Sequence, residues 1–113
     1  TYNYRFGHRD SAAEIQAYSA FPAVCQNHTC HSAELPFVFG SSHYSGLPES
    51  ALNKAITAAM TSLWGSFVRG EAPSAPGVPA WPAFGAERRG LLLGDTVRLD
   101  AERATCEFWD GLG

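Results

Sequence analysis

The stretch TCHSAELPFVFG, residues 29–40, is the part of the sequence on which both the fold and the candidate site depend. A histidine, His31, stands among small residues, and a compact apolar run from Leu35 to Phe39 follows it at once. This layout suits a side chain that packing holds still and that reaches into a cleft. Because imidazole titrates near neutral pH, it can accept and return a proton. We predict that His31 is catalytic; the alternative is a structural histidine that donates to a backbone carbonyl.

The residues before this stretch predict a strand followed by a short helix. Aromatic and polar side chains alternate over residues 1–6, as in a β-strand. A capping box at Ser11 and Glu14 then predicts a helix over residues 12–20. That helix ends before Pro22, because the residue that precedes a proline avoids the helical region.

The stretch itself is flanked by loops. Residues 23–33 are predicted to be irregular, and residues 40–48 form a turn-rich connection. The apolar run 35–39 is too short to decide between two structures. It fits a helix with Pro36 in the first turn, where the missing N–H is harmless, and it equally fits a buried strand.

The clearest predicted element is a helix from about residue 49 to Gly70. Its apolar side chains recur at helical spacing and indicate a face that packs into a core rather than a cofactor site. That face comprises Leu52, Ile56, Ala59, Met60, Leu63 and Phe67. The proline-rich residues 71–85 then predict an extended surface connection, which Trp81 is expected to pin to the body.

The last part of the chain predicts more strand and a terminal helix. Residues 91–93 are predicted to be a short strand, a turn follows at 94–95, and residues 96–99 continue the strand. Residues 100–109 are then predicted to form a helix with Asp100 as its N-cap.

The composition indicates one modest globular domain of 113 residues, with 45% hydrophobic and 17% charged side chains. A net charge of −3 without long basic runs disfavours nucleic acid and anionic membranes as partners. No apolar run approaches the roughly 20 residues of a membrane-spanning helix. Three Trp, four Tyr and seven Phe are many for a chain of this length. We expect the chain to pack against a larger body, although a well-filled core is the simpler alternative.

The three cysteines are Cys25, Cys30 and Cys106, and an odd number leaves one unpaired or paired outside the chain. A Cys25–Cys30 disulfide would stiffen the loop that carries His31 and would indicate an oxidising compartment, either secreted or periplasmic. Cys25, His28, Cys30 and His31 are also potential zinc ligands. Their cramped spacing argues against a metal site, and no metal is predicted.

No Gly-x-Ser-x-Gly motif occurs in the chain, so a complete Ser-His-acid triad within it is not supported. The chain nevertheless resembles the type-B carboxylesterases, the family that includes the cholinesterases, over nearly its whole length. Residues 31–40 resemble the family's catalytic-histidine segment, and residues 2–8 its late sheet strand. Three later segments also resemble parts of that family: a helix end at residues 64–70, a Trp-Pro turn at 81–84 and the final helix at 106–110.

This resemblance implies an α/β-hydrolase fold of which residues 1–113 are the C-terminal segment of a single domain. The upstream part, absent from this chain, would supply the Ser nucleophile and the acid, because such folds run Ser, acid, His along the chain. The implied activity is carboxylic ester hydrolysis of a small-molecule ester, without a cofactor. A beginning at Thr1 in mid-sheet fits this interpretation.

The resemblance also assigns roles to individual residues. His31 would be the third triad member, and Glu34 would orient the site without being the triad acid. Ser32 stands where the family commonly has glycine. Cys106 occupies the position of a bridging cysteine in cholinesterases, with its partner expected upstream of Thr1.

Two other functions are compatible with the same residues. The chain could belong to an esterase-like protein without catalysis, as in adhesion relatives that keep the fold as a binding surface. It could also be a small metal-binding module built on residues 25–31. Stoichiometric zinc on those side chains would distinguish the second possibility.

Overall fold

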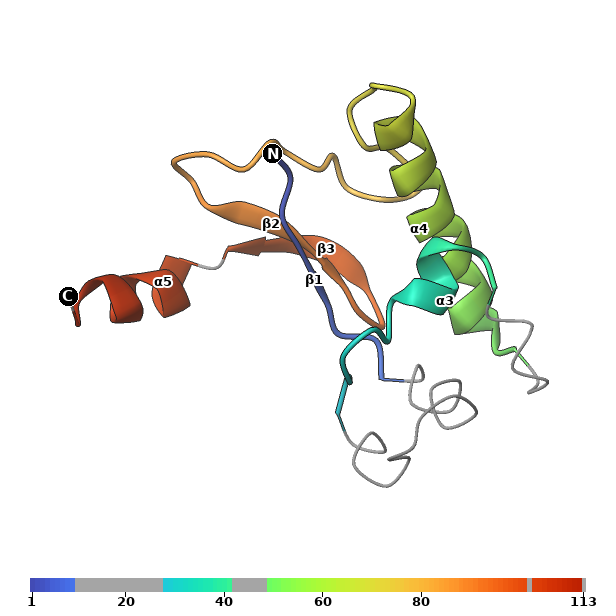
Figure 1. The fold of residues 1–113 in the computed structure, drawn as a ribbon, viewed down its shortest axis with the longest axis horizontal. Coiled ribbons are helices and arrows are strands. Elements are labelled where there is room, and N and C mark those ends of the chain that lie inside the picture. The colour runs from blue at the N-terminus through green and yellow to red at the C-terminus, as the bar shows by residue number, and fades with distance from the viewer. Residues whose placement is uncertain (10–27, 42–48, 102, 113) are drawn as a thin grey trace.

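The computed structural model describes residues 1–9, 28–41, 49–101 and 103–112 as a small sheet with helices beside it (Figure 1). Its elements are β1 (Tyr4–Phe6), α3 (Leu35–Val38), α4 (Ala51–Val68), β2 (Arg89–Leu93), β3 (Val97–Ala101) and α5 (Arg103–Asp110). In Figure 1, α3 and α4 lie together on one side of the sheet, and α5 lies beyond its other end. The predicted helix over residues 12–20 falls outside the described residues, as does most of the connection over 40–48.

The three strands form a mixed sheet in the order β1-β2-β3. β1 pairs with β2 in parallel, with Tyr4 opposite Leu91 and Phe6 opposite Leu93. β2 and β3 are antiparallel on either side of the turn that contains Asp95. Opposed residues share a face, so the aromatic side chains of β1 join the leucines of β2 on the side that packs inward. The predicted alternation in residues 1–6 is confirmed, although the strand itself covers only three residues.

β1 lies at the edge of this sheet, and within the described residues no strand pairs with its outer side. The Gly7 N–H extends the β1–β2 pairing by donating to the Leu93 carbonyl at 2.8 Å. A parallel edge strand presents a row of unpaired backbone donors and acceptors, and parallel sheets occur mostly in proteins where further strands and helices cover them.

The long helix predicted from residue 49 to Gly70 is confirmed as α4. Its start is fixed by Ser50, whose Oγ accepts a hydrogen bond from the Asn53 N–H at 3.0 Å. Its end is fixed by Gly70 at φ 81°, where a side chain would be strained. The fully buried face differs from the predicted one, because polar side chains take part and Phe67 is 56% exposed. The buried residues of α4 are Asn53, Ile56, Met60, Leu63 and Ser66.

The short apolar run after His31 forms a helix, α3, which settles the alternative that the sequence left open. Pro36 lies in its first turn, as expected. At the C-terminus the Gly40 N–H donates to the Phe37 carbonyl, and the Ser41 N–H donates to the Pro36 carbonyl at 2.8 Å. Gly40 has a φ of 61°, so this is a Schellman cap that ends the helix after one turn.

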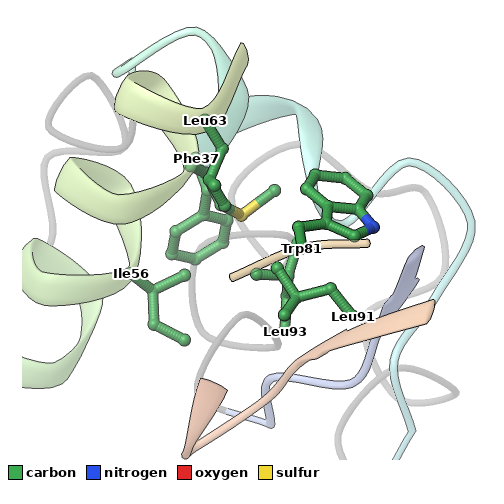
Figure 2. Packing of buried hydrophobic residues seen from close by; sticks show 7 residues of the cluster. Phe37, Ile56, Leu63, Trp81, Leu91 and Leu93 are labelled. Atoms are coloured by element: carbon green, nitrogen blue, oxygen red, sulfur yellow. The ribbon is translucent and has the colours of Figure 1, made fainter. Parts of the chain in front are cut away.

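The core lies between these helices and the sheet (Figure 2). Phe37 of α3 and two residues of α4, Ile56 and Leu63, face Leu91 and Leu93 of β2, with Trp81 closing one side. The cluster consists of Phe37, Ile56, Met60, Leu63, Trp81, Leu91 and Leu93. Burial of this apolar surface joins four separate chain segments, so α3 is held by the same core as the sheet.

The connection between α4 and β2 is held to the sheet as predicted. Trp81 is 8% exposed, and its indole Nε1 donates to the Asn3 carbonyl at 2.9 Å. The Phe84 N–H donates to the Thr1 carbonyl at 2.8 Å. These contacts tie the proline-rich segment to the chain just before β1.

The predicted role of Asp100 is wrong. Asp100 lies within β3, opposite Gly90, and its carboxylate forms an ion pair with Arg5 at 2.7 Å. α5 begins three residues later, at Arg103. Strand pairing across the β2–β3 hairpin therefore takes precedence over the local capping signal. In the part of the chain that the structure describes, no helix has the length and apolar character needed to cross a membrane.

Candidate functional site

His31 lies in a tight turn immediately before α3, and its side chain is exposed. The Ala33 N–H donates to the Cys30 carbonyl, and the Leu35 N–H donates to the Ser32 carbonyl, each at 3.2 Å. Ala33 is fully buried directly after the turn, and Phe37 is fully buried one helical turn further on. The backbone around His31 is thus fixed on one side while its imidazole faces outward. Within the described residues the imidazole makes no hydrogen bond or ion pair.

Ser32 has a left-handed backbone conformation, with φ at 66°. The resemblance described above leads us to expect glycine at this position, and glycine adopts positive φ without the steric cost that a Cβ imposes. The left-handed conformation at this position would therefore favour glycine, but this chain adopts it with a serine.

We expect Ser32→Gly to raise the free energy of unfolding of the complete protein by about 0.5–1 kcal/mol. Relief of the left-handed strain is worth about 1–2 kcal/mol, and the greater freedom of glycine in the unfolded chain offsets about half of it. Chemical denaturation measures the change. Ser32→Ala is the control, because it keeps the Cβ and should give no such gain; equal stability of the two variants would contradict the strain at Ser32.

Glu34 is half-buried at the N-cap of α3, three residues after His31. Burial raises the pKa of the Tyr4 hydroxyl, and the negative charge of Glu34 raises it further. The Glu34 carboxylate is therefore close enough to β1 for its charge to act on that strand. No side-chain hydrogen bond caps α3.

The neighbouring cysteines and histidines do not form a metal cluster in the described structure. Among those residues no three His, Cys, Asp or Glu side chains are grouped as metal ligands require. Cys30 is disulfide-bonded. Cys25 lies outside the described residues, as does the side chain of Cys106, so the Cys25–Cys30 pairing stays a prediction.

Sequence reasoning missed a polar cluster formed by two buried residues, His8 and Asn53, and the exposed Asp95. His8 Nε2 lies 2.6 Å from Asn53 Oδ1, and His8 Nδ1 lies 3.2 Å from Asp95 Oδ1. His8 is fully buried, and Asn53 is 4% exposed. Two signals pointed to this cluster. His8 continues the inward period-two series of β1, and Asn53 falls on the buried face of α4, three residues before Ile56.

An apolar cavity of about 160 Å³ lies elsewhere, between β1, α4 and the segment around Trp81. It is lined by Tyr2, Tyr4, Leu63, Trp64, Phe67, Pro73 and Trp81. The rings of Tyr4, Trp64 and Trp81 meet within 5.0–6.2 Å between centroids. None of the lining residues belongs to the segment 28–41, so this cavity is separate from the turn that carries His31.

Comparison with known proteins supports one family. Residues 1–109 match the model of the carboxylesterase family. The chain is 32% identical to carboxylesterase 5A of Felis catus over 90% of its own length and 22% of that protein. It is 32% identical to carboxylesterase 4A of Bos taurus over 73% of its own length and 15% of that protein. The chain therefore spans about a fifth of the length of these curated relatives, and it belongs to the carboxylesterase family.

Proposed function

We propose that the complete protein of which this chain is a part hydrolyses carboxylic esters, with His31 as the proton-transfer residue of a Ser-acid-His triad. One observation supports the proposal: residues 31–34 form a hydrogen-bonded turn that exposes His31, and the nearby Ala33 and Phe37 are buried. A general base needs an exposed ring on a fixed backbone, because the ring must reach the reacting group and stay in the productive position.

In the proposed reaction, His31 accepts the proton of a serine hydroxyl as the oxygen attacks the ester carbonyl. It then donates that proton to the departing alcohol, which leaves an acyl-enzyme. A water molecule then gives a proton to His31 as its oxygen attacks the acyl carbonyl. The bond between the acyl carbon and the serine oxygen breaks, the acid leaves, and His31 returns the proton to the serine oxygen. The second imidazole nitrogen would donate to an acidic side chain, and Glu34 would orient the site from the N-cap of α3.

The serine and the acid are proposed to lie on an upstream portion of the same enzyme, which completes an α/β-hydrolase domain. Two features support such a partner. β1 is a parallel edge strand on which further strands can add. Two large apolar side chains next to the His31 turn are also exposed: Leu35 is 44% and Phe39 is 75% exposed. Both features suit a chain segment whose full fold covers them.

A disulfide between Cys25 and Cys30 is part of this proposal. Cys30 is already disulfide-bonded, and a bridge to Cys25 would close a short loop just before His31. Its main effect would be to hold that loop, because short loops gain little from cross-linking the unfolded chain. Such a bridge places the protein in an oxidising compartment, secreted or periplasmic.

A serine-directed reagent tests the proposed function. We expect the complete protein to hydrolyse a short-chain p-nitrophenyl ester and to lose this activity as a fluorophosphonate labels one serine. Mass mapping of the labelled peptide should place that serine outside residues 1–113, because the chain has no Gly-x-Ser-x-Gly motif. Absence of both hydrolysis and labelling would favour a non-catalytic binding protein. Loss of activity with a chelator and its return with zinc would favour the metal-binding module.

A further inference from the structure

The polar cluster of His8, Asn53 and Asp95 joins three parts of the fold that are far apart in the sequence. His8 follows β1 directly, Asn53 lies in the first turn of α4, and Asp95 lies in the turn between β2 and β3. Both imidazole nitrogens face oxygen atoms of the other two residues, at 2.6 and 3.2 Å. The sheet and α4 are thus held together by polar contacts as well as by the apolar core.

The Asp95 carboxylate is the outer anchor of this cluster. It accepts a hydrogen bond from the Arg9 N–H at 3.4 Å. This backbone hydrogen bond lowers the pKa of Asp95, and the hydrogen bond with His8 lowers it further. Asp95 therefore remains a charged acceptor at neutral pH. The hydrogen bond to this carboxylate thus helps to fix the orientation of the buried His8 imidazole.

The same imidazole also contacts α3. The His8 ring meets the ring of Phe37 edge-on, with centroids 5.4 Å apart and an interplanar angle of 86°. The Phe6 ring lies 5.4 Å from that of Phe37 and 6.2 Å from that of His8, so the three rings form one cluster. Phe37 is fully buried, and its carbonyl accepts a hydrogen bond from the Thr61 hydroxyl of α4 at 3.4 Å. His8 thus forms part of the surface on which α3 rests, and α3 begins four residues after His31.

From this chain of contacts we infer that His8 is a positioning residue for His31: fixed by Asn53 and Asp95, it sets through Phe37 the place of α3 and of the turn before it. The inference rests on the proposed catalytic role of His31. Small displacements of a catalytic group are costly, because a misplacement of about 1 Å can lower the rate about 100-fold. His8 touches no reacting atom in this proposal; it acts only through the packing of Phe37.

The test uses the complete enzyme with His8→Gln and Asn53→Leu, and with Ser66→Ala as the matched control. Ser66 is buried at the opposite end of α4, where its hydroxyl accepts a hydrogen bond from the Ser74 N–H at 2.9 Å. Ser66→Ala therefore removes a buried polar contact of the same helix without touching α3. We expect the two cluster variants to lower kcat per titrated active site about tenfold with little change in KM, and Ser66→Ala to leave both unchanged.

Hydrogen exchange of the peptide over residues 31–41 gives a reading that does not depend on activity. We expect its amides to exchange faster in the cluster variants and at the normal rate in Ser66→Ala. Normal kcat and normal exchange in His8→Gln would overturn the inference, as would equal losses in Ser66→Ala, which would indicate general destabilisation. If the His8→Gln protein does not accumulate, Asp95→Asn replaces it, because Asp95 is 59% exposed and its substitution should disturb folding less. Asp95→Asn must then lower kcat and speed the exchange of residues 31–41, each by a smaller amount. If His31→Ala keeps its turnover, the proposed function fails, whereas a normal His8→Gln beside an inactive His31→Ala removes only the positioning role.

Discussion

We expect His31→Ala to lower kcat of the complete enzyme by about 10⁴- to 10⁶-fold, because the members of a catalytic triad act as a unit. Without the imidazole, the serine hydroxyl keeps its proton at neutral pH and the leaving alkoxide receives none. The free energy of unfolding should change by less than about 0.5 kcal/mol, as for most exposed positions. His31 is exposed, and the contacts that fix its turn are made by the backbone and by Ala33.

The matched control is His28→Ala, which removes a second exposed histidine only three residues earlier. Its kcat should equal that of the unchanged enzyme, and so should its melting temperature. Steady-state hydrolysis of a soluble ester, with circular dichroism to verify the fold, measures both variants. A His31→Ala enzyme that keeps its turnover within tenfold would refute the role assigned to His31, and equal losses in His28→Ala would point to the loop as a whole.

Periodic patterns predicted the regular elements well, because each pattern follows from one buried face. The alternation in residues 1–6 and the helical spacing from residue 52 to residue 63 both describe a side of the chain that meets the core. Trp81 was also predicted correctly, since a large aromatic within a proline-rich segment has few ways to be buried except against the body.

The errors arose where contacts distant in the sequence decide the structure. Asp100 has the chemistry of an N-cap, but pairing with Gly90 and the ion pair with Arg5 keep it in β3. Phe67 fits the apolar spacing of α4, yet it is 56% exposed, whereas the neighbouring Ser66 is buried and its hydroxyl forms hydrogen bonds with residue 74. Arg5 is far from Asp100 in the sequence, and apolar periodicity does not register the hydrogen bonds of Ser66, so the local pattern alone gives the wrong answer.

The candidate site divides in the same way. Its outer member, His31, was predicted from its position before an apolar run and from the resemblance of residues 31–40 to a known segment. The proposed inner support consists of two polar residues at core positions, His8 and Asn53, and the exposed Asp95. A hydrophobic pattern treats such residues as interruptions. Only the folded structure brings their three chain segments together. The hydrogen bonds that form there explain why polar side chains occupy buried positions.

Phe37 connects these two parts, and we expect Phe37→Ala to lower the free energy of unfolding of the complete enzyme by about 3–5 kcal/mol. The ring is fully buried and contacts those of Phe6 and His8, and it belongs to the same core cluster as Met60 and Leu63. Removing it forfeits the transfer free energy of an aromatic side chain and leaves a cavity that a tightly capped, one-turn helix cannot fill. Urea denaturation followed by fluorescence measures the change, with the midpoint compared at constant m-value.

Phe37→Leu is the control, because it keeps most of the volume without a polar change and should cost less than about 1.5 kcal/mol. Phe37→Leu removes the aromatic ring but keeps most of the buried apolar volume, whereas Phe37→Ala removes both, so the comparison isolates the effect of the buried volume. If Phe37→Ala cost no more than Phe37→Leu, Phe37 would not be the anchor of α3, and the contact between His8 and α3 would have no mechanical consequence. The expected difference, by contrast, would mean that the turn carrying His31 depends on the core of the sheet, since Phe37 is the one fully buried side chain of α3.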